Sequence, residues 1–395
     1  EQDMVMTAAG LSLGGKNPVG VSYSAFLTAR AFYQIREMSK HHELIICALS
    51  DEEHHPAARS ELGKHSEHVY FFRLRKWKIL LRLIKALFSG KPFQTAYFYN
   101  KRIKKAIHSI ARKHRPDHIF CQLIRTAEYA IELPTDKTLD YQDVFSEGLN
   151  RRLKLAPWHQ KPLLSMEYRR VKKYEGFVFD LFDKKTIISQ PDRDKIPHPG
   201  RNSIEIIPNG VDTDFFKPAD CPKEYDLLFT GNMAYPPNVD GAEFLIREIM
   251  PYVWKEIPDV RVVIAGATPS ARVKALEGKN VIVTGWVEDI REYYRASRIF
   301  IAPMRIGTGL QNKVLEAMAT KLPCITSPLA NAALKAVPGK PLLTGSEPAE
   351  YAKHILSLHK DIDRYNSISE EGYLFVLREF NWESTTRKLE SVITG

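Results

Sequence analysis

The clearest indication of the fold comes from the stretch Arg298-Ile-Phe-Ile-Ala-Pro-Met-Arg-Ile-Gly-Thr-Gly-Leu-Gln-Asn-Lys-Val-Leu-Glu-Ala-Met-Ala319. It begins as a buried strand that ends at Pro303, continues through a loop with Gly307 and Gly309, and becomes helical at about Gln311. A glycine loop that opens a helix presents free backbone N–H groups and the positive end of the helix dipole to phosphate. The stretch therefore predicts a parallel α/β sheet with an anion site at the carboxyl end of one strand.

Two charged residues follow within the first helical turns. Lys313 and Glu316 are three positions apart, so they share one helix face. Such a pair places a cation for a diphosphate beside a carboxylate for ribose hydroxyls. Either residue alone is more typical of a solvated helix surface. Their combination with the strand and the glycine loop favours a binding site.

Short apolar runs alternate with helical patterns along most of the chain, which is typical of parallel sheets with right-handed crossovers. The runs that predict buried strands are Met4 to Thr7, Leu44 to Leu49, His118 to Cys121, Thr186 to Ser189, Ile204 to Ile207, Asp226 to Thr230, Val260 to Ala265, Asn280 to Thr284 and Arg298 to Pro303. Helical windows lie at Tyr23 to Met38, Val239 to Val253 and Gln311 to Ala319.

A boundary is predicted near residues 190–202, where proline, glycine and charged residues concentrate. We therefore expect an N-terminal Rossmann-like domain over residues 1–195 and a second one over residues 203–375. Residues 376–395 are expected to form a final helix. The length of 395 residues agrees with two domains that each bury their own core.

The composition is that of a soluble globular protein, with 44% hydrophobic and 26% charged residues. It excludes a disordered, collagen-like or coiled-coil chain. The four cysteines are scattered and form no C-x-x-C pair, which argues against a zinc site and indicates a reducing compartment such as the cytoplasm. No run approaches the roughly 18 apolar residues of a spanning helix.

One block makes the protein basic. Residues 71–115 hold 14 of the 57 Lys and Arg residues and no acid, so the rest of the chain has 43 basic against 47 acidic residues. Apolar side chains recur there at helical spacing, namely Trp77, Leu80, Leu81, Ile84, Leu87 and Phe88, and cations fall on the opposite face, namely Arg75, Lys78, Arg82 and Lys85. This basic amphipathic helix predicts an anionic membrane surface as partner. Nucleic acid is less favoured, because no nucleic-acid-binding motif is present. The alternative is an ordinary helix whose apolar face packs on the core and whose basic face is solvated.

The stretch at 298–319 resembles the donor-site signature of the family-four glycosyltransferases, which have the GT-B fold. Further matches are Ile207-Pro-Asn-Gly-Val-Asp212, Phe229-Thr-Gly-Asn-Met-Ala-Tyr-Pro-Pro-Asn238, Ile264-Ala-Gly266, Thr284-Gly-Trp-Val-Glu-Asp289 and Phe380-Asn-Trp382. The N-terminal half, with Asp140, Asp143, Ser146, Glu167 and Glu175, is similar to bacterial members that build exopolysaccharide or other surface glycans.

The resemblance implies two Rossmann-like domains facing across a cleft, with the last helix crossing back to the first domain. It implies transfer of a sugar from a nucleotide diphosphate to a lipid-linked or glycan acceptor, with retained configuration and without metal or cofactor. Glu316 would hold the ribose, and Lys313 with Arg305 would neutralise the leaving diphosphate. The donor site would also include Gly231, Asn232, Gly266, Trp286, Gly307, Thr308, Gly309, Leu310 and Gln311. Gly14 and Gly15 would form a loop over the diphosphate and acceptor, for which a tight turn is the alternative.

The sequence departs from the family pattern in three places. Thr308 replaces the first acid of E-x7-E, Asn232 replaces a basic residue, and Asp140, Gln142 and Asp143 stand where a histidine is usual. These departures leave two alternatives open, a catalytically weak nucleotide-sugar-binding subunit and a nucleotide-sugar epimerase. The two D-x-D sequences are interpreted as structural rather than as metal ligands. Residues 192–194 lie in the expected linker, and residues 212–214 follow Asn209-Gly210, where Asp commonly caps turns.

Overall fold

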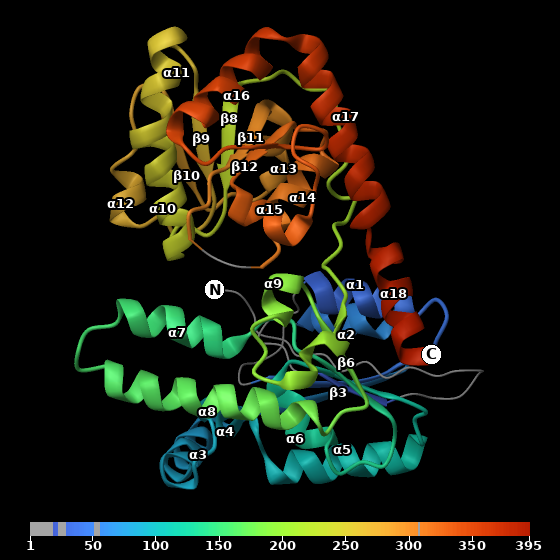
Figure 1. Cartoon of the computed structure of the whole chain (residues 1–395). Helices are drawn as coiled ribbons and strands as arrows, with labels where there is room; N and C mark the ends of the chain where they lie inside the picture. The colour runs from blue at the N-terminus through green and yellow to red at the C-terminus, as the bar shows by residue number, and fades with distance from the viewer. Residues whose placement is uncertain (1–18, 23–28, 51–55, 307–308) are drawn as a thin grey trace. The chain divides into compact units, whose positions relative to one another are not determined.

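The computed structural model describes residues 19–22, 29–50, 56–306 and 309–395. The chain divides into two compact units, the first comprising Glu1–Pro208 with Thr385–Gly395 and the second comprising Asn209–Ser384. Figure 1 shows the elements of both. Each unit is a parallel sheet covered by helices, so the predicted α/β class is confirmed.

The first sheet has seven parallel strands in the order β3-β2-β1-β4-β5-β6-β7. The strands are β1 (Val19–Ser22), β2 (Ile45–Ser50), β3 (His68–Arg73), β4 (Ile119–Gln122), β5 (Lys137–Asp140), β6 (Lys184–Ile187) and β7 (Glu205–Ile206). The chain builds outward from β1 in one direction and then starts again at β4 on its other side, which is the Rossmann strand order. The carboxyl ends of β1 and β4 therefore form the switch point of this sheet.

Helices flank this sheet on both faces (Figure 1). They are α1 (Ala29–Met38), α2 (Pro56–Gly63), α3 (Lys76–Ser89), α4 (Phe93–Phe98), α5 (Lys101–His114), η1 (Ile124–Thr126), α6 (Ala127–Ala130), α7 (Phe145–Leu155), α8 (Lys161–Phe179), α9 (Gln190–Arg193) and η2 (Pro199–Ser203). The apolar run of β2 is buried along its whole length, as expected for a strand covered on both faces.

The second sheet repeats the Rossmann order with six parallel strands, β10-β9-β8-β11-β12-β13. They are β8 (Tyr225–Thr230), β9 (Val262–Ala265), β10 (Val281–Gly285), β11 (Ser297–Ala302), β12 (Cys324–Thr326) and β13 (Leu343–Thr344). The helices are α10 (Pro236–Phe244), the π-helical turn η3 (Leu245–Ile249), α11 (Met250–Glu256), α12 (Ala271–Lys274), α13 (Ile290–Ala296), α14 (Asn312–Ala319), α15 (Pro328–Leu334), α16 (Pro348–Lys360) and α17 (Ile362–Glu379).

The prediction for the N-terminus is tested only in part. The sequence placed the first strand at Met4 to Thr7, which lies outside the described residues, and a helix from Tyr23. In the structure the central strand β1 is formed by Val19–Ser22, and the described part of the helix begins at Ala29. The short run Val19–Ser22 after Pro18 pairs with β2 in parallel. This strand was not predicted, because Gly20 and Ser22 interrupt its apolar pattern.

The boundary between the units lies later than the composition suggested. The segment Ile204 to Ile207 was expected to open the second domain at residue 203. Instead β7 pairs in parallel with β6 and extends the first sheet, so the first unit continues to Pro208. The turn formers of residues 190–202 are used within the first unit, in α9 and η2.

The last helix, α18 (Trp382–Thr394), belongs largely to the first unit. Its Leu389 and Ile393 are buried in a cluster with side chains of α1, β2 and β4. Residues 376–395 were expected to form one helix, but α17 ends at Glu379 and α18 starts at Trp382. The break is stabilised by Asn381, whose Oδ1 accepts a hydrogen bond from the Ser384 amide at 2.6 Å.

Candidate functional site

The second sheet has its switch point at β8 and β11. The chain runs from β8 towards β10 on one side and returns to β11 on the other. In open parallel sheets ligands bind beyond the carboxyl ends of the strands at this point. The loop after β8 contains Gly231 and Asn232, and the segment after β11 leads into α14. The quoted stretch therefore lies at the position that the topology reserves for a ligand.

Two glycines let the backbone close up here. Gly231 and Gly266 follow β8 and β9 with φ angles of +153° and +146°. A Cβ atom on Gly266 would come within 1.8 Å of the Gly231 carbonyl oxygen, and one on Gly231 would meet the amide of Asn238 at 2.6 Å. Both positions therefore require glycine, and the two strand ends approach more closely than any side chain permits.

Lys313 is half-buried and held by three different neighbours. Its Nζ donates to Asn238 Oδ1 at 2.7 Å, lies 4.6 Å from the ring centre of Phe229 and contacts the sulfur of Met304 at 3.5 Å. Burial lowers the pKa of Lys313 to about 7, and the nearby charge of Glu316 partly opposes this shift. The cation is thus aimed by neutral groups, and its charge depends on pH near neutrality.

Glu316 is oriented by a chain of hydroxyl groups. Its Oε2 accepts a hydrogen bond from the Tyr294 hydroxyl at 2.8 Å, and that hydroxyl lies 2.9 Å from Thr230 Oγ1. Tyr294 and Thr230 are buried, whereas Glu316 is half-buried. Burial raises the pKa of Glu316, while the Tyr294 hydrogen bond and the Lys313 charge lower it.

A second polar chain ties the strand loops together. Asn238 donates from Nδ2 to the carbonyl oxygen of Asn232 at 3.0 Å, and Asn232 Oδ1 accepts from Thr268 Oγ1 at 2.9 Å. Asn232, which replaces a basic residue of the family pattern, thereby links the loops after β8 and β9. The sequence analysis assigned no role to Asn238, Thr268, Thr230 or Tyr294. Asn238 closes a quoted motif, but no sequence signal pairs Tyr294 with Glu316.

The start of α14 is open to an anion. Gln311 precedes the helix, and its side chain makes no capping hydrogen bond. The first backbone N–H groups of a helix have no partner within the helix, so they are available to a ligand. Leu310 packs against the core, and Gly309 has a φ of +86° that favours glycine. Gly307 and Thr308 lie outside the described residues.

Arg305 points to a different set of partners from the one expected. Its Nε and NH2 donate to both oxygens of Asp240 at 3.1 and 2.9 Å, and its NH1 donates to Glu248 at 3.0 Å. The guanidinium also covers the Phe244 ring at 4.3 Å. Arg305 therefore braces the loop after β11 against α10 and η3 in this structure. Its predicted part in neutralising a diphosphate stays a prediction.

Trp286 also differs from a pocket-lining residue. It follows β10, and 74% of its side chain is exposed. Its membership of the donor site stays a prediction. The loop candidates Gly14 and Gly15 lie outside the described residues.

The first-unit candidates separate into a structural and an accessible group. Asp140 ends β5 and is fully buried, with its carboxylate accepting from Arg30 Nε and Thr186 Oγ1 at 3.0 Å each. It therefore joins the end of β5 to α1 and to the neighbouring strand β6. Gln142 has a φ of +58°, which is uncommon for a non-glycine residue and marks a strained loop. Asp143 is exposed, so it remains accessible to a ligand.

Two further acids of the first unit are buried. Glu167 accepts backbone hydrogen bonds from Phe93 and Gln94 at 2.9 and 3.1 Å, so it fixes the start of α4. Glu175 is fully buried and accepts from the Ser146 amide at 3.1 Å. Burial raises the pKa of Glu175 to about 7. These acids hold α8 against α4 and α7.

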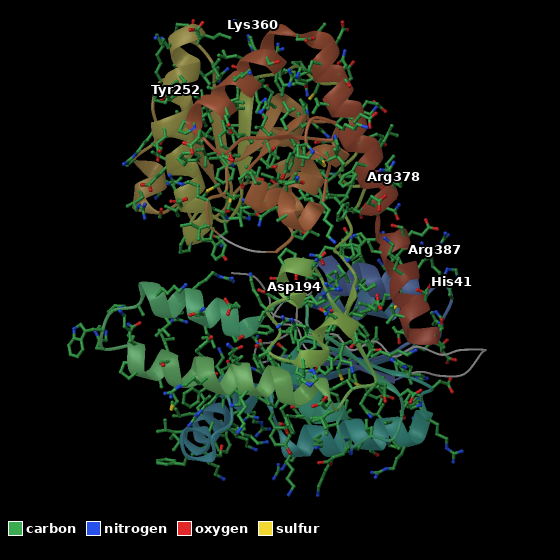
Figure 2. All side chains as sticks on the ribbon, in the orientation of Figure 1. His41, Asp194, Tyr252, Lys360, Arg378 and Arg387 are labelled. Carbon is green, nitrogen blue, oxygen red and sulfur yellow. The ribbon has the colours of Figure 1, made fainter. Side chains whose placement is uncertain are left out.

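Both D-x-D sequences make local structural contacts, and only the second one acts as a cap. Asp192 is buried and bonded to Ser189 at the start of α9, and Asp194, labelled in Figure 2, pairs with Arg193 at 3.3 Å. Asp212 Oδ1 accepts from the amides of Asp214 and Phe215 at 3.0 and 2.9 Å. The described residues contain no group of three or more His, Cys, Asp or Glu placed to hold a metal ion.

Helix α3 reverses the ordinary amphipathic arrangement. Its apolar side chains at positions 77, 80, 81, 84, 87 and 88 are 45–83% exposed, and only Ile79 and Ala86 are buried. Arg75 and Lys85 are exposed, while Lys78 and Arg82 are half-buried. The alternative of a core-facing helix is therefore wrong for this face. In the described part of the chain no helix is long and apolar enough to cross a membrane.

One known protein family matches most of the second unit. Residues 224–361 match the family described as "Glycosyl transferases group 1". This range runs from just before β8 to just after α16, so it contains the whole site around Lys313 and Glu316. The matched range therefore includes residues 298–319, the stretch that resembles the family's donor-site signature.

Relatives cover nearly the whole chain. An uncharacterized 44.6 kDa protein in the cps region of Klebsiella pneumoniae is 23% identical over 365 residues, which are 86% of this chain and 88% of that protein. The structure of a glycosyltransferase from Rickettsia africae covers 96% of this chain and 98% of its own, with a TM-score of 0.65 and 15% identity. Anabaena HepE in complex with UDP and glucose covers 92% and 94%, with a TM-score of 0.61 and 12% identity. The two solved structures show that the chain has the GT-B fold.

Proposed function

We propose that this chain, a group 1 glycosyltransferase of the GT-B fold, transfers a sugar from a nucleotide diphosphate to a lipid-linked or glycan acceptor. The observation that carries the proposal is the placement of Lys313 and Glu316 at the switch point of the second sheet, beside the open start of α14. A cation, a carboxylate and free helix N–H groups are what a nucleotide diphosphate requires.

In this proposal Glu316 accepts hydrogen bonds from the ribose hydroxyls. Its Oε2 is already held by Tyr294, which leaves Oε1 to face a ligand. The α14 N-terminus and Lys313 contact the diphosphate. When the bond between the sugar and the phosphate breaks, negative charge grows on the leaving diphosphate, and these preorganised donors stabilise it. The proposal therefore assigns charge stabilisation to groups of the chain, without a metal, and it includes retention of the anomeric configuration.

The donor and the pathway rest on the relatives. The HepE structure contains UDP and glucose, which supports a uridine nucleotide as the first donor to test. The Klebsiella relative lies in a cps region, which supports a place in capsular or other surface polysaccharide synthesis. We further propose that the protein works at the cytoplasmic face of the membrane, because the exposed apolar face of α3 lies within an acid-free basic block.

The test is a thermal-shift panel with UDP, GDP, dTDP and ADP and their sugar conjugates, followed by transfer assays with the conjugates that bind. Ligand binding to the folded state raises the melting temperature. We expect one nucleotide class to raise it for the wild type and not for Glu316→Ala. The matched control is Glu277→Ala, since Glu277 is exposed in the same unit.

The outcomes separate the proposal from its alternatives. Binding with transfer that depends on an acceptor supports a glycosyltransferase. Conversion of the donor sugar without an acceptor would indicate an epimerase, and binding without turnover in acceptor mixtures would indicate a binding subunit. A shift that persists in Glu316→Ala would contradict the site assignment.

A further inference from the structure

A cavity lies between α3, α4 and the start of α5, within the first unit and distinct from the Lys313 site. It has a volume of about 470 Å³. Six of its lining residues are cations, and none is an acid; the cations are Lys78, Arg82, Lys85, Lys91, Lys101 and Arg102. The basic block thus gathers six positive charges around one open, solvent-accessible cavity.

The helices around the cavity are fixed in place. Arg170 of α8 donates to the carbonyl oxygens of Ala86 and Leu87, at 2.9 Å each, and so holds the end of α3. Arg82 donates to the carbonyl oxygen of Tyr99, which joins α3 to the residues just after α4. Asn100 caps α5 by accepting from the Arg102 amide at 2.9 Å. The cavity is therefore built by the fold and does not depend on mobile side chains alone.

Three of the cations are available to a ligand. Lys91 is not one of them, because its Nζ forms an ion pair with Glu128 Oε2 at 3.3 Å. Among the described residues no carboxylate lies within ion-pair distance of Lys85, Lys101 or Arg102, and all three are exposed. Exposed cations without a partner around a shared space repel one another, and an anion between them removes this repulsion. The cavity accordingly favours a compact group with more than one negative oxygen.

The walls of the cavity are apolar, and they continue into an exposed apolar strip. Leu81, Ala86 and Ala96 line the cavity below the cations. Leu81 also belongs to the exposed face of α3, where Ile84 and Phe88 follow at the spacing of neighbours on one helix face. A free phosphate has no apolar part that could contact such a strip, whereas a lipid carries a phosphate and an apolar chain in one molecule.

We propose that this cavity binds the phosphate headgroup of a membrane lipid, with the lipid chain against the exposed apolar face of α3. The inference rests on the membrane association proposed above and makes it specific. The amphipathic helix supplies apolar contact with the bilayer, and the cavity supplies recognition of the phosphate. The acid-free block of residues 71–115 then serves one binding site in addition to general attraction.

The experiment measures binding of the full chain to vesicles by sedimentation. Vesicles of phosphatidylcholine alone are compared with vesicles that also contain phosphatidic acid. The test variant is Lys85→Gln with Lys101→Gln, which removes two charges from the cavity. The matched control is Lys105→Gln with Arg112→Gln, which removes two exposed charges of the same block outside the cavity. All four side chains are exposed, so we expect unchanged melting temperatures.

Both variants lose general attraction to an anionic surface, so the difference between them is decisive. We expect the cavity variant to bind the phosphatidic acid vesicles at least fivefold more weakly than the control variant. Equal loss in the two variants would mean that charge alone draws the chain to the membrane, and the cavity site would be wrong.

Two further measurements identify the source of the phosphate. Inorganic pyrophosphate should compete only weakly, because it lacks an apolar chain. If pyrophosphate raised the melting temperature of the wild type more than that of the cavity variant, while phosphatidic acid vesicles failed to sediment the protein, the cavity would take a free anion and the proposal would be overturned. The nucleotide shift at the Lys313 site is recorded on the same variants and should be unchanged, so failure of either proposal is recognised separately.

Discussion

Helices α14 and α3 place charge and apolar surface in opposite ways. In α14 the charged pair Lys313 and Glu316 is half-buried, and each member is held by a neutral hydrogen-bond partner. Helix α3 carries cations and also a row of apolar side chains that are largely exposed. Burying charge and exposing apolar surface are both unfavourable unless a ligand or partner compensates. Each unit therefore has an unfavourable surface at its proposed binding site: half-buried charge in the second unit and exposed apolar surface in the first.

The surroundings of the two helices explain the difference. α14 starts at the switch point of a six-stranded sheet, so its inward residues Val314, Leu315 and Met318 are buried in the main core. α3 lies beside α4 and α8 at the border of the first unit, where only Ile79 and Ala86 are covered (Figure 1). The same amphipathic pattern thus serves a buried helix in one unit and an open one in the other.

Removing the cation of α14 is expected to have the largest effect. Lys313→Met retains the apolar stem over Phe229 but loses the charge, so transfer should slow by about 10²- to 10³-fold, as for loss of one preorganised donor. The melting temperature should change little, because the buried charge no longer needs to be desolvated. Steady-state kinetics on a verified donor provides the measurement.

The control for this change is Lys274→Met, which replaces an exposed lysine of α12 in the same unit. It should leave the rate unaltered. If the two variants were equally active, Lys313 would not contact the leaving diphosphate. Helices α14 and α3 would then differ only in how their side chains pack.

Replacing two exposed apolar residues of α3 is expected to have the next largest effect. Leu80→Ser with Ile84→Ser should weaken binding to anionic vesicles by about 10²-fold, because each side chain contributes roughly 1.5 kcal/mol or more when it enters the bilayer. Both side chains are exposed, so the free energy of unfolding should change by less than about 0.5 kcal/mol. Chemical denaturation and vesicle sedimentation are measured on the same preparation.

A buried leucine of α14 supplies the opposite case. Leu315→Ala should lower the free energy of unfolding by about 2–5 kcal/mol, since Leu315 is completely buried. If the α3 variant were destabilised to the same degree, its apolar row would be part of a core, and the membrane proposal would lose its main support.

The sequence predicted the class of fold and the local structure of residues 298–319 well, because both depend on local patterns. The strand, loop and helix of residues 298–319 are found in β11 and α14 within one residue of their expected limits. Contacts distant in sequence were not predictable. The pairing of Glu316 with Tyr294, and of Arg305 with Asp240, depends on how separate crossovers pack. Similarly, periodicity gives two faces of α3 but does not say which one meets the core.

The buried position of Lys313 also predicts a dependence on pH that exposed lysines would not share. Its pKa of about 7 means that the free protein loses this charge as the pH rises above 7. A diphosphate favours the charged form, so nucleotide binding above pH 7 should take up a proton, and affinity should fall by up to tenfold per pH unit. Calorimetry at pH 8 in two buffers with different heats of ionisation measures this uptake.

Proton uptake should vanish in Lys313→Met, which has no group to charge. Uptake that persists in this variant would assign the titration to another residue. Absence of uptake in the wild type would show that Lys313 stays charged despite its burial, and the hydrogen bond to Asn238 would then be sufficient to solvate it.

The smallest effect is expected from the hydroxyl that orients the carboxylate. Tyr294→Phe removes the 2.8 Å hydrogen bond to Glu316 and leaves the buried ring in place. A hydrogen bond to a charged group contributes about 1.5–3 kcal/mol, but water at this half-buried carboxylate replaces part of it, so nucleotide affinity should fall by about three- to tenfold. Because Glu316 then loses a hydrogen bond that lowers its pKa, the loss of nucleotide affinity should be larger at pH 6 than at pH 8.

Tyr293→Phe, at the neighbouring residue, is the control. If both variants bound nucleotide equally at both pH values, Glu316 would not need its orienting partner, and the polar chain from Thr230 would serve only to stabilise the core of the second unit.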